Sequence, residues 1–123
     1  MEVFLLPPGR AVQANEEGIR LARRRAWNDD IILRDPDGHG EVRLRARDVS
    51  VAGVFVYSPA AATPGMEFIC SLPTHDGVLE ARGRVTRVEF DQREPDRTGM
   101  GIAFTSLHRD SRDWLLQYTG AAA

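Results

Sequence analysis

Apolar residues recur at every second position through most of the chain beyond residue 28, which is the spacing of β-strands. The segment 41–48 shows this most clearly, because three apolar residues alternate there with three arginines. The apolar set is Val42, Leu44 and Ala46, and the arginines are Arg43, Arg45 and Arg47. Successive side chains of a strand point to opposite faces, so the apolar set is predicted to face a core and the arginines to face solvent.

Five other segments have the β-branched, aromatic or alternating character of short strands. They are 31–34, 51–57, 66–72, 78–90 and 99–104. Turn-forming sequences separate them, and the strongest of these lies at 35–38. The alternation in 78–90 is imperfect, which predicts a β-bulge or bend near Gly83. Six short strands joined by turns predict an all-β domain, a small antiparallel barrel or sandwich.

The two ends of the chain have a different pattern. Residues 12–27 are weakly helical, with Asn15 as a candidate N-cap, and predict either a helix or a mobile arm. Near the other end, Ser106 is a candidate cap for a final helix that reaches Tyr118. The apolar stripe of that helix is expected to be Leu107, Trp114, Leu115 and Tyr118. The predicted organisation is an N-terminal arm or helix at 1–19, one domain at 20–119 and a disordered tail at 120–123.

The basic residues of this chain are unusual in being of one kind. All sixteen are arginine, in a chain of 123 residues with a formal net charge of −2. The absence of lysine excludes Schiff-base chemistry and a Walker-type phosphate lysine. Arginine's planar fork still suits phosphates and guanine edges, although GC-rich coding is the simplest cause of the bias. The slightly acidic balance argues against a general nucleic-acid binder.

No feature of the sequence predicts membrane insertion, secretion or catalysis. No apolar run approaches eighteen residues, and the N-terminal run has Glu2 and stops at Pro7, unlike a signal peptide. Cys70 is the single cysteine, and we expect a buried, inert thiol in a cytoplasmic protein. Ser50 lacks the glycine-flanked turn of a hydrolase nucleophile. The three histidines lack partners at metal-ligand spacing, so we expect no enzyme, metal or cofactor.

A polar sequence lies between two predicted strands, at the point where one ends and the next begins. Asp48 and Ser50 are two residues apart and would point to the same side of an extended chain. Gly53 follows, where the missing Cβ permits an unusual dihedral angle or the close approach of a ligand. A carboxylate with two acceptor oxygens fits the N1–H and N2–H₂ donors of guanine. The alternative is a turn that the Asp or Ser side chain stabilises.

These residues resemble the PilZ domain family, the bacterial receptors for cyclic di-GMP. Asp48, Ser50 and Gly53 complete the family's Asp-x-Ser-x-x-Gly motif. Residues 82–88 resemble its Gly-Arg-Val strand, and residues 101–104 resemble its late Gly-hydrophobic-x-Phe strand, which a helix follows. The resemblance covers about residues 20–118. It implies a six-stranded antiparallel barrel with a C-terminal helix.

The family's second motif is Arg-x-x-x-Arg, placed before the first barrel strand. Arg20 and Arg24 fit it in the right region, although Arg43/Arg47 and Arg93/Arg97 fit the same spacing. The resemblance implies that Arg20 and Arg24 bind phosphate or guanine, with Arg23 and Arg25 as substitutes in a shifted register. A solvated basic helix face is the alternative for this segment.

The resemblance implies a binding module whose ligand is cyclic di-GMP. Arg20, Arg24, Asp48, Ser50 and Gly53 would contact the ligand, and docking of the arginine arm on the barrel would switch an effector protein. The alternative is a degenerate PilZ domain that does not bind cyclic di-GMP and acts by protein–protein interaction in motility or signalling. A third hypothesis, a nucleic-acid-binding barrel that uses the arginine face of 41–48, is disfavoured by the net charge.

Overall fold

The computed structural model describes residues 23–58 and 62–121, which form a set of strands followed by one helix. The strands are β1 (Arg25–Ala26), β2 (Asp30–Arg34), β3 (Glu41–Ser50), β4 (Gly53–Tyr57), β5 (Glu67–Thr74), β6 (Gly77–Glu89) and β7 (Gly99–Leu107). A 3₁₀ turn, η1 (Pro95–Arg97), precedes β7, and the helix α3 (Arg109–Thr119) follows it. The polar segment 91–98, which separates the last two predicted strands, therefore contains one short helical turn.

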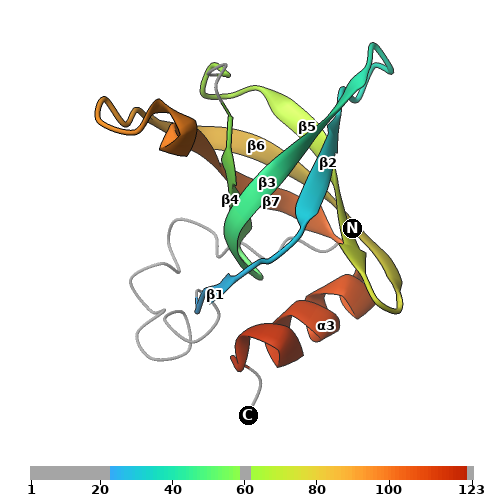
Figure 1. Ribbon diagram of the computed structural model, residues 1–123. Coiled ribbons are helices and arrows are strands. Elements are labelled where there is room, and N and C mark those ends of the chain that lie inside the picture. Colours follow the sequence, from blue (N-terminus) through green and yellow to red (C-terminus); the bar gives the residue numbers. More distant parts are fainter. Residues whose placement is uncertain (1–22, 59–61, 122–123) are drawn as a thin grey trace, which may run out of the picture.

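Six of these strands close into an antiparallel barrel (Figure 1). Their order is β3-β2-β5-β6-β7-β4, and the pairing of β4 with β3 closes the circle. The short strand β1 is additional: it pairs with the end of β3, through Arg25 opposite Val49 and Ala26 opposite Asp48. The predicted all-β, six-stranded antiparallel barrel with a C-terminal helix is thus confirmed.

The predicted irregularity of the 78–90 segment is also confirmed. The register of β6 against β7 shifts between Arg82 and Gly83, and again between Val85 and Arg87. A Cβ at Gly83 would lie 2.5 Å from the side chain of Ile102, so a glycine relieves crowding at the first shift. The bulges bend the long strand, which lets it follow the curve of the barrel.

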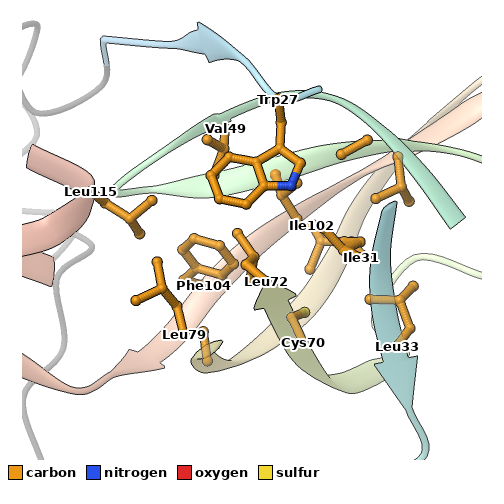
Figure 2. Packing of buried hydrophobic residues seen from close by; sticks show 14 of the residues in the cluster. Trp27, Ile31, Leu33, Val49, Cys70, Leu72, Leu79, Ile102, Phe104 and Leu115 are labelled. Carbon is orange, nitrogen blue, oxygen red and sulfur yellow. The ribbon is translucent and has the colours of Figure 1, made fainter. Parts of the chain in front are cut away.

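The hydrophobic core fills the barrel and extends to the helix (Figure 2). Ile31, Leu33, Leu72 and Phe104 are each about 1% exposed or less, and Leu115 of α3 is fully buried. Cys70 is also fully buried, and burial raises the pKa of its thiol to about 12, so the thiol is inert at neutral pH. This burial confirms the expectation for the single cysteine.

The predicted alternation on 41–48 holds at one end of β3 only. Ala46 is buried, but Leu44 is half-buried and Val42 is 46% exposed. Val42 lies next to the β2–β3 turn, and this hairpin projects beyond the rim of the barrel in Figure 1. The apolar face of the strand therefore extends further than the core that it covers.

Two expectations for the ends of the fold need correction. Of the two alternatives for 12–27, a helix or a mobile arm, the helix does not hold at Arg25 and Ala26, which are extended and pair with β3; residues 1–22 lie outside the described residues. Ser106 does not cap the last helix, because it lies inside β7 opposite Arg82. The N-cap is His108, whose Nδ1 accepts a hydrogen bond of 3.2 Å from the amide of Asp110.

The helix also ends later than the sequence suggested. Gly120 adopts a left-handed conformation, with φ of 74°, and caps α3. Ala121 is 7% exposed, so the expected disordered tail does not include these two residues; 122–123 lie outside the description. Among the described residues, α3 is too short and too polar to cross a bilayer.

Candidate functional site

A β-bulge in β3 places two consecutive polar side chains on the outer face of the barrel. Ala46 and Val49 are both buried in the core, although an even alternation would put them on opposite faces. The register of β3 against β4 shifts between Ala46 and Asp48, so Arg47 is the extra residue of the bulge. Arg47 and Asp48 consequently lie side by side outside the core, joined by a hydrogen bond of 2.7 Å from Nε to Oδ2.

Ser50 ends β3 and holds the turn into β4. Its hydroxyl oxygen accepts from the amide of Ala52 at 3.0 Å, the bond expected of a serine-stabilised turn. The same oxygen accepts from Nη1 of Arg24 at 3.3 Å. The turn hypothesis is therefore correct for Ser50, and the structure adds a contact with an arginine of the candidate motif.

Arg24 joins the predicted residues into one cluster. Its Nε donates to Oδ1 of Asp48 at 2.6 Å, and its Nη2 lies 3.5 Å from the carbonyl oxygens of Asp48 and Gly53. Arg24, Asp48, Ser50 and Gly53 are thus in direct contact. Arg20 lies outside the described residues.

Arg23 and Arg25 point away from this cluster. Nη1 of Arg25 donates to the carbonyl oxygen of Tyr118 at 2.8 Å, and Nη1 of Arg23 lies 3.5 Å from that of Gly120. The segment is extended, so its side chains alternate: Arg24 faces Asp48, and its two neighbours face the C-terminal end of α3. Cations at this end satisfy free helix carbonyls. In this structure the two substitute residues therefore hold the helix and not the Asp48 cluster.

Aromatic packing fixes the same segment to α3. Trp27 is 6% exposed and meets Trp114 and Tyr118 edge to face, with ring centroids 5.9 and 5.3 Å away. The hydroxyl of Tyr118 donates to the carbonyl oxygen of Ala26 at 2.5 Å. We call residues 23–27 the strap, because they join the Asp48 cluster to the end of the helix.

The glycine of the motif is required by the fold itself. Gly53 does not have a positive φ, so the unusual dihedral angle considered for it is absent. A Cβ at this position would collide with the carbonyl oxygen of Ile102 in the neighbouring strand β7. The missing side chain lets β4 and β7 approach each other, and this brings Gly53 beneath the guanidinium of Arg24.

Sequence reasoning missed a second group of residues beside Asp48. The guanidinium carbon of Arg47 lies 3.8 Å from the ring centroid of Phe55, and that of Arg87 lies 5.7 Å from it. Glu89 accepts from Nε of Arg87 at 2.7 Å and lies 3.7 Å from Nη1 of Arg47. The sequence placed Arg47 on the solvent-facing arginine row of 41–48 and in a competing Arg-x-x-x-Arg pair, but the bulge that turns it toward Asp48 was not predicted.

The two arginines keep Asp48 ionised. Burial alone would raise the pKa of its carboxyl, but hydrogen bonds from Arg47 and Arg24, together with their charges, outweigh burial and lower it. Burial likewise opposes the charge of Arg47, yet the bond and charge of Asp48 and the charge of Glu89 raise its pKa. The site thus carries a fixed negative charge between two fixed positive ones at any physiological pH.

Asp48→Asn is expected to reduce stability at neutral pH and to have less effect in acid. The folded chain lowers the pKa of Asp48 below its unfolded value of about 3.9, so the ionised carboxylate stabilises the fold fully above that value. This contribution is lost as the pH falls through the lower, folded pKa. Solvent screens the half-exposed arginines, so we expect about 1 kcal/mol or less.

Urea unfolding of both proteins at pH 7 and pH 2.5 measures this effect. Asp113→Asn, on the exposed face of α3, is the matched control. A difference between wild type and Asp48→Asn that is as large at pH 2.5 as at pH 7 would contradict the ion-pair explanation.

Two other features of the described chain lie apart from the Asp48 cluster. An open groove of about 940 Å³ runs between the β5–β6 hairpin and the start of α3, lined by residues that include Val78, Leu79 and Trp114. At the β2–β3 turn, the side chains of Asp35, Asp37 and His39 gather within 4.8 Å, which the sequence spacing did not suggest. Turn residues with mostly exposed carboxylates commonly cluster in this way without binding an ion.

Comparison with known proteins identifies the family. The model of the PilZ domain matches residues 19–121. No curated protein sequence matches the chain. Several solved structures share its fold at low sequence identity. The inhibitor of motility MotI/DgrA from Bacillus subtilis aligns with a TM-score of 0.68 and 17% identity, over 78% of this chain and 47% of its own.

Two structures determined with c-di-GMP align as well. The PilZ domain of YcgR from Escherichia coli has a TM-score of 0.58 and 16% identity, over 80% of this chain and 86% of its own. PlzA from Borreliella burgdorferi has a TM-score of 0.56 and 14% identity, over 82% of this chain and 36% of its own. The chain therefore spans about half of MotI and about a third of PlzA, but most of the YcgR domain. With a closed six-stranded barrel and a family match over most of its length, the chain belongs to the PilZ domain family.

Proposed function

We propose that this chain is a binding module for cyclic di-GMP and not an enzyme, and that the ligand binds on the outer face of the barrel around Asp48. The observation that carries this proposal is the convergence of Arg24 on Asp48, Ser50 and Gly53. The family match and the two aligned structures determined with c-di-GMP support the ligand class.

The carboxylate of Asp48 is suited to a guanine edge. Guanine presents two adjacent N–H donors, and an ionised carboxylate presents two oxygens with about four lone-pair sites. Within the chain, Arg24 donates to one of these oxygens and Arg47 donates to the other. Arg24 thus takes the place of a guanine donor. Because Arg24 belongs to the strap and not to the barrel, a guanine can exchange with it without breaking a barrel strand.

An arginine released from Asp48 can bind a phosphate group of the same ligand. Cyclic di-GMP carries two phosphates, and a guanidinium binds a phosphate through two parallel hydrogen bonds. We propose that Arg24 exchanges the carboxylate of Asp48 for a phosphate, and that Arg20 supplies the second arginine of the motif. Ser50 and Gly53 shape the surface beneath the ligand, the former through its hydroxyl and the latter by having no side chain.

The strap provides a route from the ligand to a protein partner. One face carries Arg24 and the other carries Arg23, Arg25 and Trp27, which bind the end of α3. Moving Arg24 from Asp48 to a phosphate shifts the strap and with it the contacts on the helix. A ligand can shift this equilibrium only through its different affinity for the two strap positions. We propose that an effector protein recognises the resulting surface.

The test is a calorimetric titration of the chain with cyclic di-GMP. We expect saturable binding, and we expect Asp48→Ala and Arg24→Ala each to weaken it more than tenfold, because each removes a charge-assisted contact worth more than about 1.4 kcal/mol. Arg43→Ala is the matched control, since Arg43 is an exposed arginine of the same strand as Asp48.

Two outcomes would overturn the proposal. Absence of saturable heat at high micromolar ligand would leave the degenerate, protein-binding PilZ domain as the better hypothesis. Equal affinities for Asp48→Ala and Arg43→Ala would place the ligand elsewhere on the barrel.

A further inference from the structure

A row of outward-facing positions crosses four neighbouring strands next to the Asp48 cluster. Asp48 of β3 lies opposite Phe55 of β4, Phe55 lies opposite Gly101 of β7, and Gly101 lies opposite Arg87 of β6. A second row of outward-facing positions lies two residues further along each of β4, β7 and β6. It contains Tyr57, Gly99 and Glu89. Each row thus has a glycine on β7, where no side chain of β7 projects from the outer surface of the sheet.

The two glycines let larger side chains lie flat on the sheet. A Cβ at Gly99 would lie 2.7 Å from the ring of Phe55, and a Cβ at Gly101 would lie 2.9 Å from the guanidinium of Arg87. Phe55 therefore covers Gly99, and Arg87 covers Gly101. Phe55 is only 1% exposed although it lies outside the barrel core, so other side chains must cover its ring.

Arg47 covers part of that ring, and the ring of Tyr57 meets it edge to face with centroids 5.9 Å apart. The guanidinium carbon of Arg47 is 3.8 Å from the ring centroid of Phe55, and the Arg47 side chain is 39% exposed. The guanidinium thus packs against the ring of Phe55, and part of the Arg47 side chain remains open to solvent. The edge of the guanidinium is held from two sides, through Nε bonded to Asp48 at 2.7 Å and Nη1 at 3.7 Å from Glu89. These contacts within the chain hold the guanidinium in place.

We propose that Arg47 is a ligand-binding residue of this site, and that a guanine base of cyclic di-GMP stacks on the side of its guanidinium that faces away from Phe55. This inference rests on the proposed function. A planar guanidinium stacks on an aromatic base, and one already held in place loses little conformational entropy on binding. Because its hydrogen bonds run along its edge, a base on its face need not break them. Arg47 remains bonded to Asp48 while Arg24 leaves.

Arg47 and Arg24 therefore have different roles. Arg24 belongs to the strap and exchanges its partner when the ligand binds, whereas Arg47 belongs to a barrel strand and stays in position. The Arg-x-x-x-Arg motif does not require an arginine at position 47. The β-bulge and the two glycines of β7 are what make Arg47 a flat surface beside the carboxylate.

Replacement of Arg47 by lysine and by alanine separates a stacking surface from a simple positive charge. Lysine keeps the charge, and can keep an ion pair with Asp48, but has no plane. We expect Arg47→Lys and Arg47→Ala each to weaken the binding of cyclic di-GMP about tenfold in calorimetric titrations. Arg45→Ala, an exposed arginine of the same strand, should bind as the wild type does. Thermal unfolding of each variant checks that the barrel is intact.

A second readout is how the loss of affinity for cyclic di-GMP in Arg47→Ala depends on salt concentration. A stacking contact is nearly independent of ionic strength, whereas a contact between a surface charge and a phosphate is screened by salt. We expect the loss in Arg47→Ala to be the same within a factor of two at 50 mM and 500 mM NaCl. A loss that largely disappears at 500 mM would overturn the stacking role in favour of a phosphate contact.

The remaining outcomes separate this inference from the proposed function. If the wild type binds and Arg47→Lys binds equally well, the inference is wrong and the proposed function stands. If Arg47→Ala binds as tightly as the wild type or more tightly, Arg47 makes no favourable contact with the ligand and only competes with it for the carboxylate of Asp48. The inference is then also wrong. If the wild type itself does not bind cyclic di-GMP, the proposed function and the inference both fall.

Discussion

Gly53→Ala is expected to be the most damaging conservative substitution on the outer face of the barrel. The new methyl group would collide with the carbonyl oxygen of Ile102, and the next nearest atoms, at 3.1 Å, are backbone atoms of Ile102 and Ala103. A strand backbone cannot move aside as a side chain can, so β4 would have to separate from β7. Overpacking of this kind costs about 3 kcal/mol, and a collision with backbone belongs at the upper end of the range.

Gly101→Ala provides the matched control. Gly101 is on the strand that Gly53 contacts, but the atoms that a Cβ would meet there belong to the long side chain of Arg87, at 2.9 to 3.2 Å. That side chain can shift at little cost. Urea unfolding should therefore show a loss of about 3 kcal/mol for Gly53→Ala and of less than about 1 kcal/mol for Gly101→Ala.

The comparison also decides why this motif has a glycine. Equal stability of the two variants would contradict the packing argument and would leave close approach of a ligand as the reason for Gly53. A large loss in Gly53→Ala alone means that the affinity of this variant for a nucleotide cannot be read as a ligand contact, because its barrel is altered as well.

The predictable parts of this fold are those set by local pattern. The strands could be read from alternation because the barrel has one buried and one exposed face. The slip at Gly83 could be read because it interrupts that alternation. The bulge of β3, at Arg47, was not found. Arg47 and Asp48 are consecutive polar residues, but they stand where the strand 41–48 is predicted to end, so the interrupted alternation indicates only the end of the strand.

The roles of the strap arginines could not be predicted for a different reason. Arg23, Arg24 and Arg25 are consecutive and chemically identical, so only the backbone conformation assigns each to a face. A weakly helical pattern left a helix or a mobile arm open for this segment, whereas pairing of β1 with β3 makes Arg25 and Ala26 extended. Tertiary pairing overrode local propensity here, and it separated Arg24 from its neighbours.

Trp27→Ala is expected to have the second large effect, on the strap and the helix together. The indole is 6% exposed and lies over the barrel core (Figure 2). It packs against the rings of Trp114 and Tyr118. Truncating a buried aromatic side chain to alanine costs about 3–5 kcal/mol. The cavity would open between the strap and α3, since Trp27 touches both.

The indole ring, and not its N–H group, should account for this cost. Nε1 of Trp27 is buried without a hydrogen-bond partner among the described residues, so removing it breaks no bond. Trp27→Phe should therefore lose much less stability than Trp27→Ala in urea unfolding. Similar losses for the two variants would show that the N–H matters and would contradict this account.

Loss of the Trp27 side chain should also change ligand binding at the Asp48 cluster, if the strap couples that cluster to the end of α3. Arg24 is three residues from Trp27, and its position on Asp48 depends on an extended strap that Trp27 and Tyr118 anchor. At temperatures where Trp27→Ala is still folded, its affinity for cyclic di-GMP should change severalfold, whereas that of Trp27→Phe should not. Trp27 is on the face of the strap that packs on the helix. A changed affinity therefore measures the coupling free energy between the helix contact and nucleotide binding. An unchanged affinity would mean that the cluster binds its ligand independently of α3, and that the helix cannot report the ligand to a partner.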